Sequence, residues 1–294
     1  MVLVDCLRAG GFPDGAINLV VGATPDTYGP IMGDARVRKV SLTGSTRVGQ
    51  QMIRDAAETV KKVSMELGGN APLIVYDDAD LDGALEVSVP TKYANCGQVC
   101  VTPDRFFIHE SLHDAFVEGF VERASKIKLG DGLDPDVAMG PLINGGSLEA
   151  IDGIVQSAVA DGATLALGGK RAAGFNEGHF YEPTVLTNVS DEMQVFAEEN
   201  FGPVAAIQTF TDQDDVIRRA NDTEYGLVAY VHSQDPRRIY RASRALCFGM
   251  VAVNRTKVTG APIPFGGMKQ SGLGREGSRL GIEAFSDVKY LCRD

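Results

Sequence analysis

The amino-acid sequence predicts an α/β fold, and three observations support that prediction. Short apolar runs typical of strands alternate along the chain with longer segments whose apolar residues recur at helical spacing. No fixed-period repeat and no low-complexity tract interrupts this alternation. A chain of 294 residues is long for one domain and sufficient for two, so it needs no metal or disulfide to stabilise its core.

The first half of the chain supplies three strands, each followed by a helical pattern. Pro90 is expected to kink or break the helix that begins at Leu81, because proline has no amide hydrogen to donate. The expected strands are 37–42, 71–78 and 105–109, and the expected helices are 45–60, the start of 81–97, and 112–127.

The second half begins with a loop at 130–143 that is rich in glycine, proline and aspartate, and the alternation then resumes. The last expected strand, "FSDVKYLC" at 285–292, has the pattern of a terminal strand that can add to an edge of its own fold or of a partner subunit. The other expected elements are helices 147–162, 212–223 and 235–246, and strands 164–169, 181–189, 205–210 and 227–233.

The beginning of the chain is abrupt. Residues 3–15 look like the end of a helix that stops at Gly10 and Gly11, with Pro13 beyond. A domain rarely opens on half of a strand–helix unit, so the sequence is expected to be the later part of a longer protein.

Charge and cysteine usage narrow the class of protein. A net charge of -11, with both signs scattered, argues against nucleic acid or an anionic membrane as a partner. No window has the roughly 18 apolar residues of a membrane span, and Asp5 and Arg8 exclude a signal peptide. An odd, scattered set of cysteines indicates a reducing, cytoplasmic setting; they are Cys6, Cys96, Cys100, Cys247 and Cys292.

Two motifs match well-known patterns but sit in the wrong context. "HESLH" at 109–113 matches a zinc-peptidase pattern that needs both histidines on one helical face. Here His109 ends an expected strand and Ser111 is the expected helix N-cap, with Asp114 three residues later, so zinc is not expected. "GLGREG" at 272–277 follows a glycine-rich loop instead of a strand, which favours a closely packed loop over a dinucleotide fingerprint.

Three further segments can carry chemistry. "TGSTRVG" at 43–49 follows a strand and opens a helix, where Ser45 can cap the helix or touch a phosphate. "MELGGNAP" at 65–72 places Glu66, a general base or a solvated carboxylate, before two glycines that let the backbone approach a ligand. In "NCGQVC" a zinc site and a disulfide are both disfavoured, which leaves a nucleophile or two inert thiols.

Taken in series, eight segments between Ala9 and Cys292 resemble the aldehyde dehydrogenase superfamily in order and spacing. Three stretches, "DGLDP", "NDTEYGL" and "GLGREGSRLGIEAF", are similar to the succinate-semialdehyde dehydrogenase branch. The eight segments are "AGGFPDGAINLVVG", "VRKVSLTGSTRVGQ", "KKVSMELGGNAPLIVYDDADLD", "NCGQVC", "GPLI", "EENFGPV", "ANDTEYGLVAY" and "PFGGMKQSGLGREG".

The resemblance implies an aldehyde dehydrogenase-like fold with an incomplete Rossmann-type cofactor domain and an α/β catalytic domain. Residues 1–66 correspond to the later part of the NAD(P)-binding domain, 67–272 to the catalytic domain, and 273–294 to a return segment and oligomerisation strand. It further implies a small-molecule aldehyde as substrate, NAD or NADP as cofactor, and a homo-oligomer, either a dimer or a tetramer.

The resemblance also assigns individual roles. Cys100 corresponds to the nucleophile, Cys96 falls on a variable position, and Glu66 corresponds to the general base. The thiolate would attack the aldehyde to give a thiohemiacetal and then a thioester, which water activated by Glu66 would hydrolyse. The cofactor-binding positions are Ser45 at the pyrophosphate, Glu199 and Phe201 at the nicotinamide ribose and ring, and Gly44, Gly49 and Leu67.

Two departures from the family pattern bear on activity. Family members carry a further N-terminal portion with the second oxyanion donor and much of the first Rossmann half. This chain alone is therefore expected to be weakly active or inactive, and the alternative is a remnant with a structural or assembly role. The branch also carries an arginine where this chain has Ala94, and Arg255, Lys257 and Thr259 are candidate replacements near the expected substrate mouth.

Overall fold

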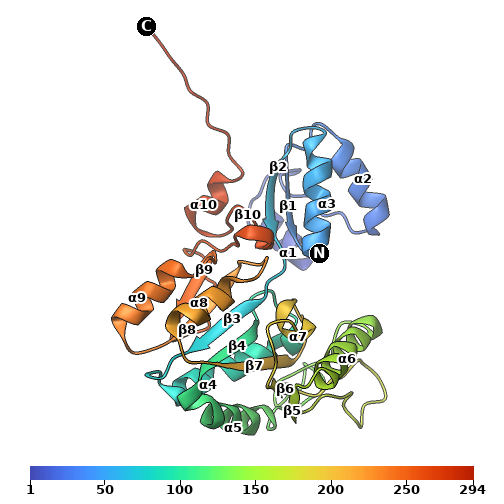
Figure 1. The fold of residues 1–294 in the computed structure, drawn as a ribbon. Helices are drawn as coiled ribbons and strands as arrows, with labels where there is room; N and C mark the ends of the chain where they lie inside the picture. The colour runs from blue at the N-terminus through green and yellow to red at the C-terminus, as the bar shows by residue number, and fades with distance from the viewer. The chain divides into compact units, whose positions relative to one another are not determined.

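The structure, a computed structural model, describes all residues from Met1 to Asp294 (Figure 1). It divides into two compact units, 1–40 with 50–63 and 41–49 with 64–294. This division follows packing density, so the functional boundaries expected at residues 66 and 272 stay predictions.

The smaller unit is mainly helical. It contains α1 (Val2–Ala9), α2 (Thr24–Gly33) and most of α3 (Thr46–Ala57). Helix α1 ends at Gly10, as the sequence predicts, with the Gly10 N–H bonded to the Cys6 carbonyl at 2.9 Å. Tyr28 on α2 donates a 2.6 Å hydrogen bond to Asp55 on α3, which fixes the two helices together.

The larger unit is built on a seven-stranded sheet in the order β5-β6-β7-β4-β3-β8-β9 (Figure 1). Every neighbouring pair is parallel except β5 and β6. The central strands are buried along almost their whole length, which explains their continuous apolar sequence. The strands are β3 (Ala71–Val75), β4 (Pro103–His109), β5 (Thr164–Leu167), β6 (Thr184–Thr187), β7 (Val204–Phe210), β8 (Val228–His232) and β9 (Met250–Val253).

Consecutive aromatic residues on β4 show that both faces of this sheet are covered. Phe106 packs on Phe116 and Phe120 of α5 (His113–Ala124), while Phe107 contacts Phe196 on α7 (Gln194–Ala197). Successive side chains of a strand point to opposite faces, so α5 and α7 lie on opposite sides. The remaining helices are α4 (Leu81–Tyr93), α6 (Gly145–Ala160), α8 (Gln213–Asn221), α9 (Pro236–Ala245) and α10 (Ser278–Glu283).

Three short strands form a second sheet in the order β1-β2-β10. They are β1 (Lys39–Thr43), β2 (Lys62–Glu66) and β10 (Gly272–Leu273). Strand β10 is antiparallel to β2 and pairs Gly272 with Glu66. A segment near the C-terminus is therefore hydrogen-bonded beside the predicted general base.

The structure corrects two local predictions, the break at Pro90 and the helix N-cap at Ser111. Helix α4 is not broken at Pro90 but continues to Tyr93, because the buried side chains after the proline hold the last turn against the core. Ser111 is not a helix N-cap: its N–H donates to the ring of His109, and α5 begins two residues later, at His113. Asp114 accordingly pairs with His113 and takes no part in a capping box.

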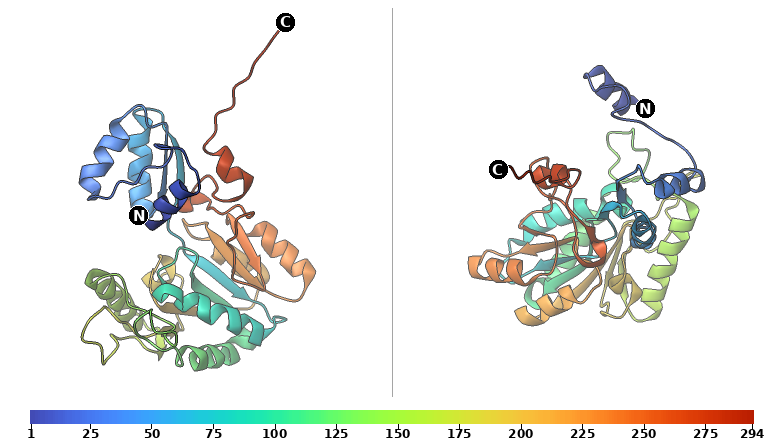
Figure 2. Two further views of the ribbon diagram at one scale, coloured as in Figure 1. Left: turned by 180° about the vertical axis from the view of Figure 1, so that it is seen from behind. Right: turned by 90° about the horizontal axis from the view of Figure 1, so that it is seen from above.

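The expected terminal strand 285–292 is also absent from the single chain. These residues are exposed and run as an extended tail without a neighbouring strand (Figure 2). No other strand pairs with these residues, and the N–H groups of Phe285 and Ser286 donate instead to the Ile282 and Glu283 carbonyls of α10. None of the helices is long and apolar enough to cross a membrane.

Candidate active site

Three predicted site segments lie at one edge of the large sheet. Residues 66–70 precede β3, residues 95–100 precede β4, and residues 199–203 precede β7. These strands are neighbours in the order β7-β4-β3 and run parallel, so their amino ends meet at the same edge (Figure 1). Open α/β sheets usually bind ligands at the carboxyl edge, so this site lies at the opposite edge from the common one.

Direct contacts join the three segments. The Gly69 N–H donates a 2.8 Å hydrogen bond to Oε1 of Glu199. A Cβ added to Gly68 would lie 2.6 Å from Oε2 of Glu199, and one added to Gly69 would overlap the carbonyl oxygen of Cys100. The two glycines therefore let the backbone after Glu66 approach both Cys100 and Glu199.

The loop before Cys100 has an unusual backbone. Asn95, Cys96 and Gly97 are consecutive left-handed residues, with φ of 50°, 58° and 71°. A Cβ on Gly97 would overlap the carbonyl oxygen of Gly202, so glycine is required where this loop packs. Residues Ala94–Gly97 form a short 3-10 turn interrupted by these left-handed residues, so Cys96 and Cys100 do not lie on one regular right-handed helix. Both are free thiols, Cys96 fully buried and Cys100 partly accessible.

Polar side chains outside the predicted set hold this loop in place. Gln98 donates to the Asn95 carbonyl at 3.0 Å and accepts from the Ile143 N–H at 2.9 Å. Tyr230 on β8 donates a 2.8 Å hydrogen bond to the Val101 carbonyl. The Gln98 contacts join the "GPLI" and "NCGQVC" segments into one hydrogen-bonded unit.

Burial and like charges shift the ionisation of the three central groups. Burial raises the pKa of Glu66 to about 7, with Glu276 adding to the effect and Arg275 opposing it. Burial also raises the pKa of Glu199 to about 7, against the Gly69 hydrogen bond. The Cys100 pKa is raised by burial and then by both carboxylates.

These shifts make Glu66 suited to proton transfer near neutral pH, because a general base works best when its pKa lies near the operating pH. Its side chain is only 4% exposed, and Oε2 has no hydrogen-bond partner. That unpaired oxygen is available to accept a proton or a hydrogen bond from a small molecule.

The predicted cofactor residues form a donor and acceptor set that fits a nicotinamide dinucleotide. Ser45 is exposed at the start of α3, where its hydroxyl lies 3.4 Å from the Val48 N–H. The Gly49 position packs directly on Leu67, so this helix start has no space for a side chain there. A helix start and a hydroxyl suit a phosphate.

Glu199 and Phe201 are the other predicted cofactor-binding residues. The Gly69 hydrogen bond occupies only Oε1 of Glu199, which leaves its other oxygen for a further hydrogen bond. Phe201 is 45% exposed and has a left-handed φ of 49°, which places an apolar ring at the surface. Gly44 is anchored beside this region by a 3.0 Å hydrogen bond from its N–H to the Glu66 carbonyl.

The three candidate substrate residues lie on an exposed irregular loop after β9. Arg255, Lys257 and Thr259 are all exposed, and none of them forms a hydrogen bond or ion pair. Thr256, between them, is 2.7 Å from the Thr91 hydroxyl on α4. The loop is thus fixed to α4, the helix that leads into the Cys100 segment. The side chains of Arg255 and Lys257 remain without an ion-pair partner.

The two rejected motifs have ordinary structural roles. His109 ends β4 and His113 begins α5, and no group of three or more His, Cys, Asp or Glu side chains could hold a metal. In "GLGREG", Gly272, Gly274 and Gly277 all have positive φ, and a Cβ on Gly272 would overlap the Met65 carbonyl oxygen. The segment is a closely packed loop.

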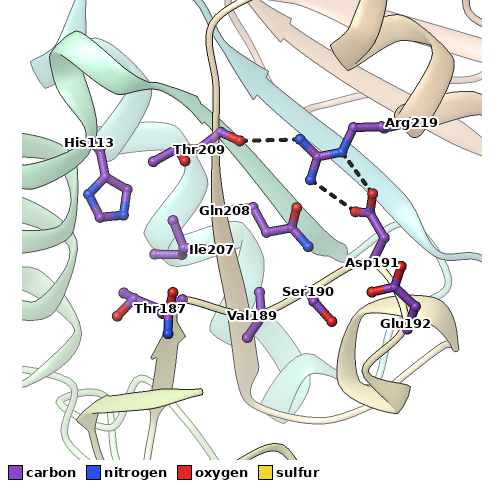
Figure 3. A pocket seen from close by; sticks show the side chains of 11 residues that line it. His113, Thr187, Val189, Ser190, Asp191, Glu192, Ile207, Gln208, Thr209 and Arg219 are labelled. Carbon is purple, nitrogen blue, oxygen red and sulfur yellow. Dashed lines mark hydrogen bonds and ion pairs between the residues drawn. The ribbon is translucent and has the colours of Figure 1, made fainter. Parts of the chain in front are cut away.

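A surface pocket is lined by a different set of residues (Figure 3). Its volume is about 450 Å³, and it is lined in part by the carboxyl end of β7. Its one guanidinium, that of Arg219, is bonded to both oxygens of Asp191 at 2.8 and 2.9 Å and to the Thr209 carbonyl at 3.2 Å (Figure 3). It offers no free cation and contains none of the predicted site residues.

Sequence reasoning missed the residues that reach this site from the C-terminal loop. Ser271 donates to the Gly68 carbonyl at 2.7 Å and accepts from the Gly226 N–H at 2.9 Å. Arg275 and Glu276 act on the ionisation of Glu66. The glycine-rich sequence of this loop was a usable signal, but a partner about 200 residues away cannot be read from it.

Known proteins are similar to this chain in sequence and in fold. An aspartate-semialdehyde dehydrogenase (non-phosphorylating) of Halomonas elongata is 48% identical over 99% of this chain and 59% of its own length. A probable NADP(+) succinate-semialdehyde dehydrogenase of Sinorhizobium fredii is 46% identical over 97% and 58%. The crystal structure of succinate-semialdehyde dehydrogenase from Burkholderia pseudomallei superposes with a TM-score of 0.96 at 45% identity, over 99% and 60%.

The chain thus spans about three fifths of the length of these relatives. The aldehyde dehydrogenase family matches residues 1–291, which is nearly every residue of the chain. Both the sequence match and the shared fold therefore show that this chain belongs to the aldehyde dehydrogenase family.

Proposed function

We propose that this chain carries the catalytic part of an NAD(P)-dependent dehydrogenase that oxidises an aldehyde to a carboxylic acid. One observation carries the proposal: the partly accessible thiol of Cys100 shares the amino edge of the sheet with two carboxylates, Glu66 and Glu199, whose pKa values burial raises to about 7. A thiol nucleophile beside a general base is the arrangement that acyl chemistry through a thioester needs.

The residues of the chain account for the covalent steps. The Cys100 thiolate attacks the carbonyl carbon and forms a thiohemiacetal, whose oxygen can take a hydrogen bond from the Cys100 backbone N–H. Oxidation of this adduct leaves a thioester on Cys100. Glu66 then accepts a proton from water, which attacks the thioester, releases the carboxylic acid and returns the thiol.

A nicotinamide cofactor fits the same set of residues. Ser45 and the start of α3 would hold its phosphates, Glu199 its ribose hydroxyls, and Phe201 its ring. When bound, the nicotinamide takes up the two electrons that the aldehyde gives up. The names of the relatives support either form of the cofactor, since the Sinorhizobium fredii protein is named for NADP(+) and a related betaine aldehyde dehydrogenase was crystallised with NAD+.

The substrate class follows from the relatives and from two cations. The relatives named above act on semialdehydes, which carry a carboxylate at the end opposite the aldehyde. In this chain Arg255 and Lys257 are exposed, unpaired cations on the loop that Thr256 fixes to α4. We infer an aldehyde with a distal carboxylate, with Thr259 as a further hydroxyl donor.

The tail 285–292 supports assembly as a homo-oligomer. Its apolar side chains, among them Val288, Tyr290 and Leu291, are 69–100% exposed, and its backbone has no neighbouring strand. Addition to a strand edge of a second copy would satisfy both. Size-exclusion chromatography with light scattering, with and without residues 288–294, tests this, and an unchanged mass would refute it.

The activity is tested by steady-state kinetics on purified 1–294. NAD+ and NADP+ are each offered with succinate, aspartate and glutarate semialdehydes, glycolaldehyde and a neutral aliphatic aldehyde. Turnover that requires Cys100, with a higher kcat/KM for the carboxylated aldehydes, supports the proposal. Absence of turnover together with an unreactive Cys100 thiol would favour the structural remnant, and equal kcat/KM for all aldehydes would refute the substrate class.

A further inference from the structure

A buried ion pair closes the loop that carries Cys100. Nζ of Lys92 lies 2.7 Å from Oδ1 of Asp104, and the two side chains are 0% and 4% exposed. Lys92 is in the last turn of α4, and Asp104 is the second residue of β4. The pair therefore joins the two ends of the segment 93–103.

Stability alone is a weak reason for such a pair. Removing two charges from water is costly, and apolar residues of similar volume often replace a buried pair without loss of stability. The segment between the two residues is strained, because Asn95 and Cys96 are left-handed without being glycine, at a cost of about 1 kcal/mol each. A strained loop keeps its shape only when its surroundings hold it.

The position of the pair connects it to the rest of the site. The residue after Asp104, Arg105, donates a 3.1 Å hydrogen bond to the carbonyl of Asn70, in the turn that follows Glu66. Asp104 and Arg105, at the start of β4, thus hold the loop before Cys100 and the turn at residues 68–70. The charge of Lys92 also acts on the buried thiol of Cys96 within the loop.

We propose that Lys92 and Asp104 are positioning residues whose ion pair keeps this loop closed over Cys96 and holds the Cys100 thiol beside Glu66 and Glu199. Its catalytic consequence rests on the proposed function, whereas loop closure itself can be measured without any dehydrogenase activity. Neither residue touches substrate in this account; both act through the loop.

The test is alkylation of the folded protein with iodoacetamide, read by peptide mass spectrometry across pH. The double variant Lys92→Met/Asp104→Leu keeps the volume of the pair without its directional link. We expect Cys96 to be alkylated at least fivefold faster than in the wild type while the melting temperature is retained. Midpoint pH for Cys100 alkylation should fall, because the thiol gains water while the facing carboxylates, Glu66 and Glu199, are unchanged.

Two further variants separate positioning from general stability. Asp104→Asn keeps an oxygen acceptor for Lys92. In this single variant the Cys96 alkylation rate should stay within about twofold of the wild type, and the Cys100 midpoint pH should stay near the wild-type value. Arg238→Leu breaks ion pairs of 2.6 and 2.7 Å to Asp77 and Asp78 at the other end of β3. It should lower the melting temperature without selective labelling of Cys96.

The proposal would be overturned if the folded double variant alkylates Cys96 at the wild-type rate and shows no shift in the midpoint pH of Cys100 alkylation. If that variant does not fold, Lys92→Gln serves in its place, since its amide ends one bond short of Nζ and cannot reach Asp104 without movement. Unchanged labelling there would overturn the proposal equally. If the wild type is inactive but its Cys96 is protected from iodoacetamide, that result would count only against the proposed function.

Discussion

The backbone N–H of Gly69 donates a 2.8 Å hydrogen bond to Oε1 of Glu199, a residue 130 positions later in the chain. The bond joins the turn after β2 to the loop before β7, and the Cys100 carbonyl lies against the same glycine. The relative placement of Cys100, Glu66 and Glu199 therefore depends on a position without a side chain.

Gly69→Ala should disrupt this site. The added Cβ would overlap the Cys100 carbonyl oxygen, which is backbone and cannot move without shifting the loop. We expect the free energy of unfolding to fall by about 1–3 kcal/mol, as for overpacked cores, and turnover to fall at least tenfold. The matched control is Gly153→Ala within α6, where the new Cβ meets nothing and should stabilise the helix by about 1 kcal/mol. Equal effects of the two variants in urea unfolding would contradict this account.

Substitution of the two cysteines of "NCGQVC" should have very different effects on turnover. Cys100→Ser should lower turnover by about 10³-fold or more, because the nucleophile itself is replaced. Cys96→Ala removes a buried thiol away from the accessible surface and should cost about 1 kcal/mol of stability while turnover stays within about twofold. A comparable loss of turnover in both variants would show that the assignment of the nucleophile is wrong.

Activity should rise with pH through a limb near 7 that belongs to Glu66. The burial that raises its pKa to about 7 keeps the carboxyl protonated, and inactive as a base, below that pH. Glu66→Gln should remove this limb from the pH profile of kcat and lower its plateau. Retention of the limb in the variant would assign it to another group, with Glu199 the first candidate because its pKa is also raised to about 7.

The same residue should make stability depend on pH. Its folded pKa is above the ordinary value of 4.5, so the folded state binds the proton more tightly than the unfolded state does. Stability is then greatest below about pH 4.5 for this group and is lost as pH rises through 7. The melting temperature of Glu66→Gln relative to the wild type should therefore be higher at pH 8 than at pH 5. A constant difference between the two pH values would contradict the shifted pKa.

Arg105 should be required for the fold in a way that lysine cannot replace. Its guanidinium is buried and donates to three backbone carbonyls, at 2.8–3.2 Å, belonging to Asn70, Arg219 and Ala220. Arg105→Lys should cost about 2–4 kcal/mol, because one ammonium cannot reach all three and buried acceptors are left unpaired. Arg218→Lys, at an exposed position of α8, is the control, with an expected change of less than about 0.5 kcal/mol in urea unfolding.

Local pattern identified most of the elements because their causes are local. The apolar run before Asp77 became β3, and the helical spacing after His113 became α5. The errors arose where tertiary context decides: α4 continues through Pro90 because its last turn is buried, and 285–292 forms no strand because no strand of the single chain pairs with it. The candidate residues were found by resemblance and composition, whereas the contacts of Gln98, Ser271 and Tyr230 could not be found that way.

The sequence by itself determined the α/β class, most of the helices and strands, and the segments that hold Cys100, Glu66 and Glu199, since these depend on periodicity and on motifs within a few residues. Only the tertiary structure decided that the three segments meet at the amino edge of the sheet and that Lys92 closes the Cys100 loop through Asp104. Strand order and burial arise from packing between residues far apart in the chain, and they set both the distances and the pKa shifts on which the chemistry depends.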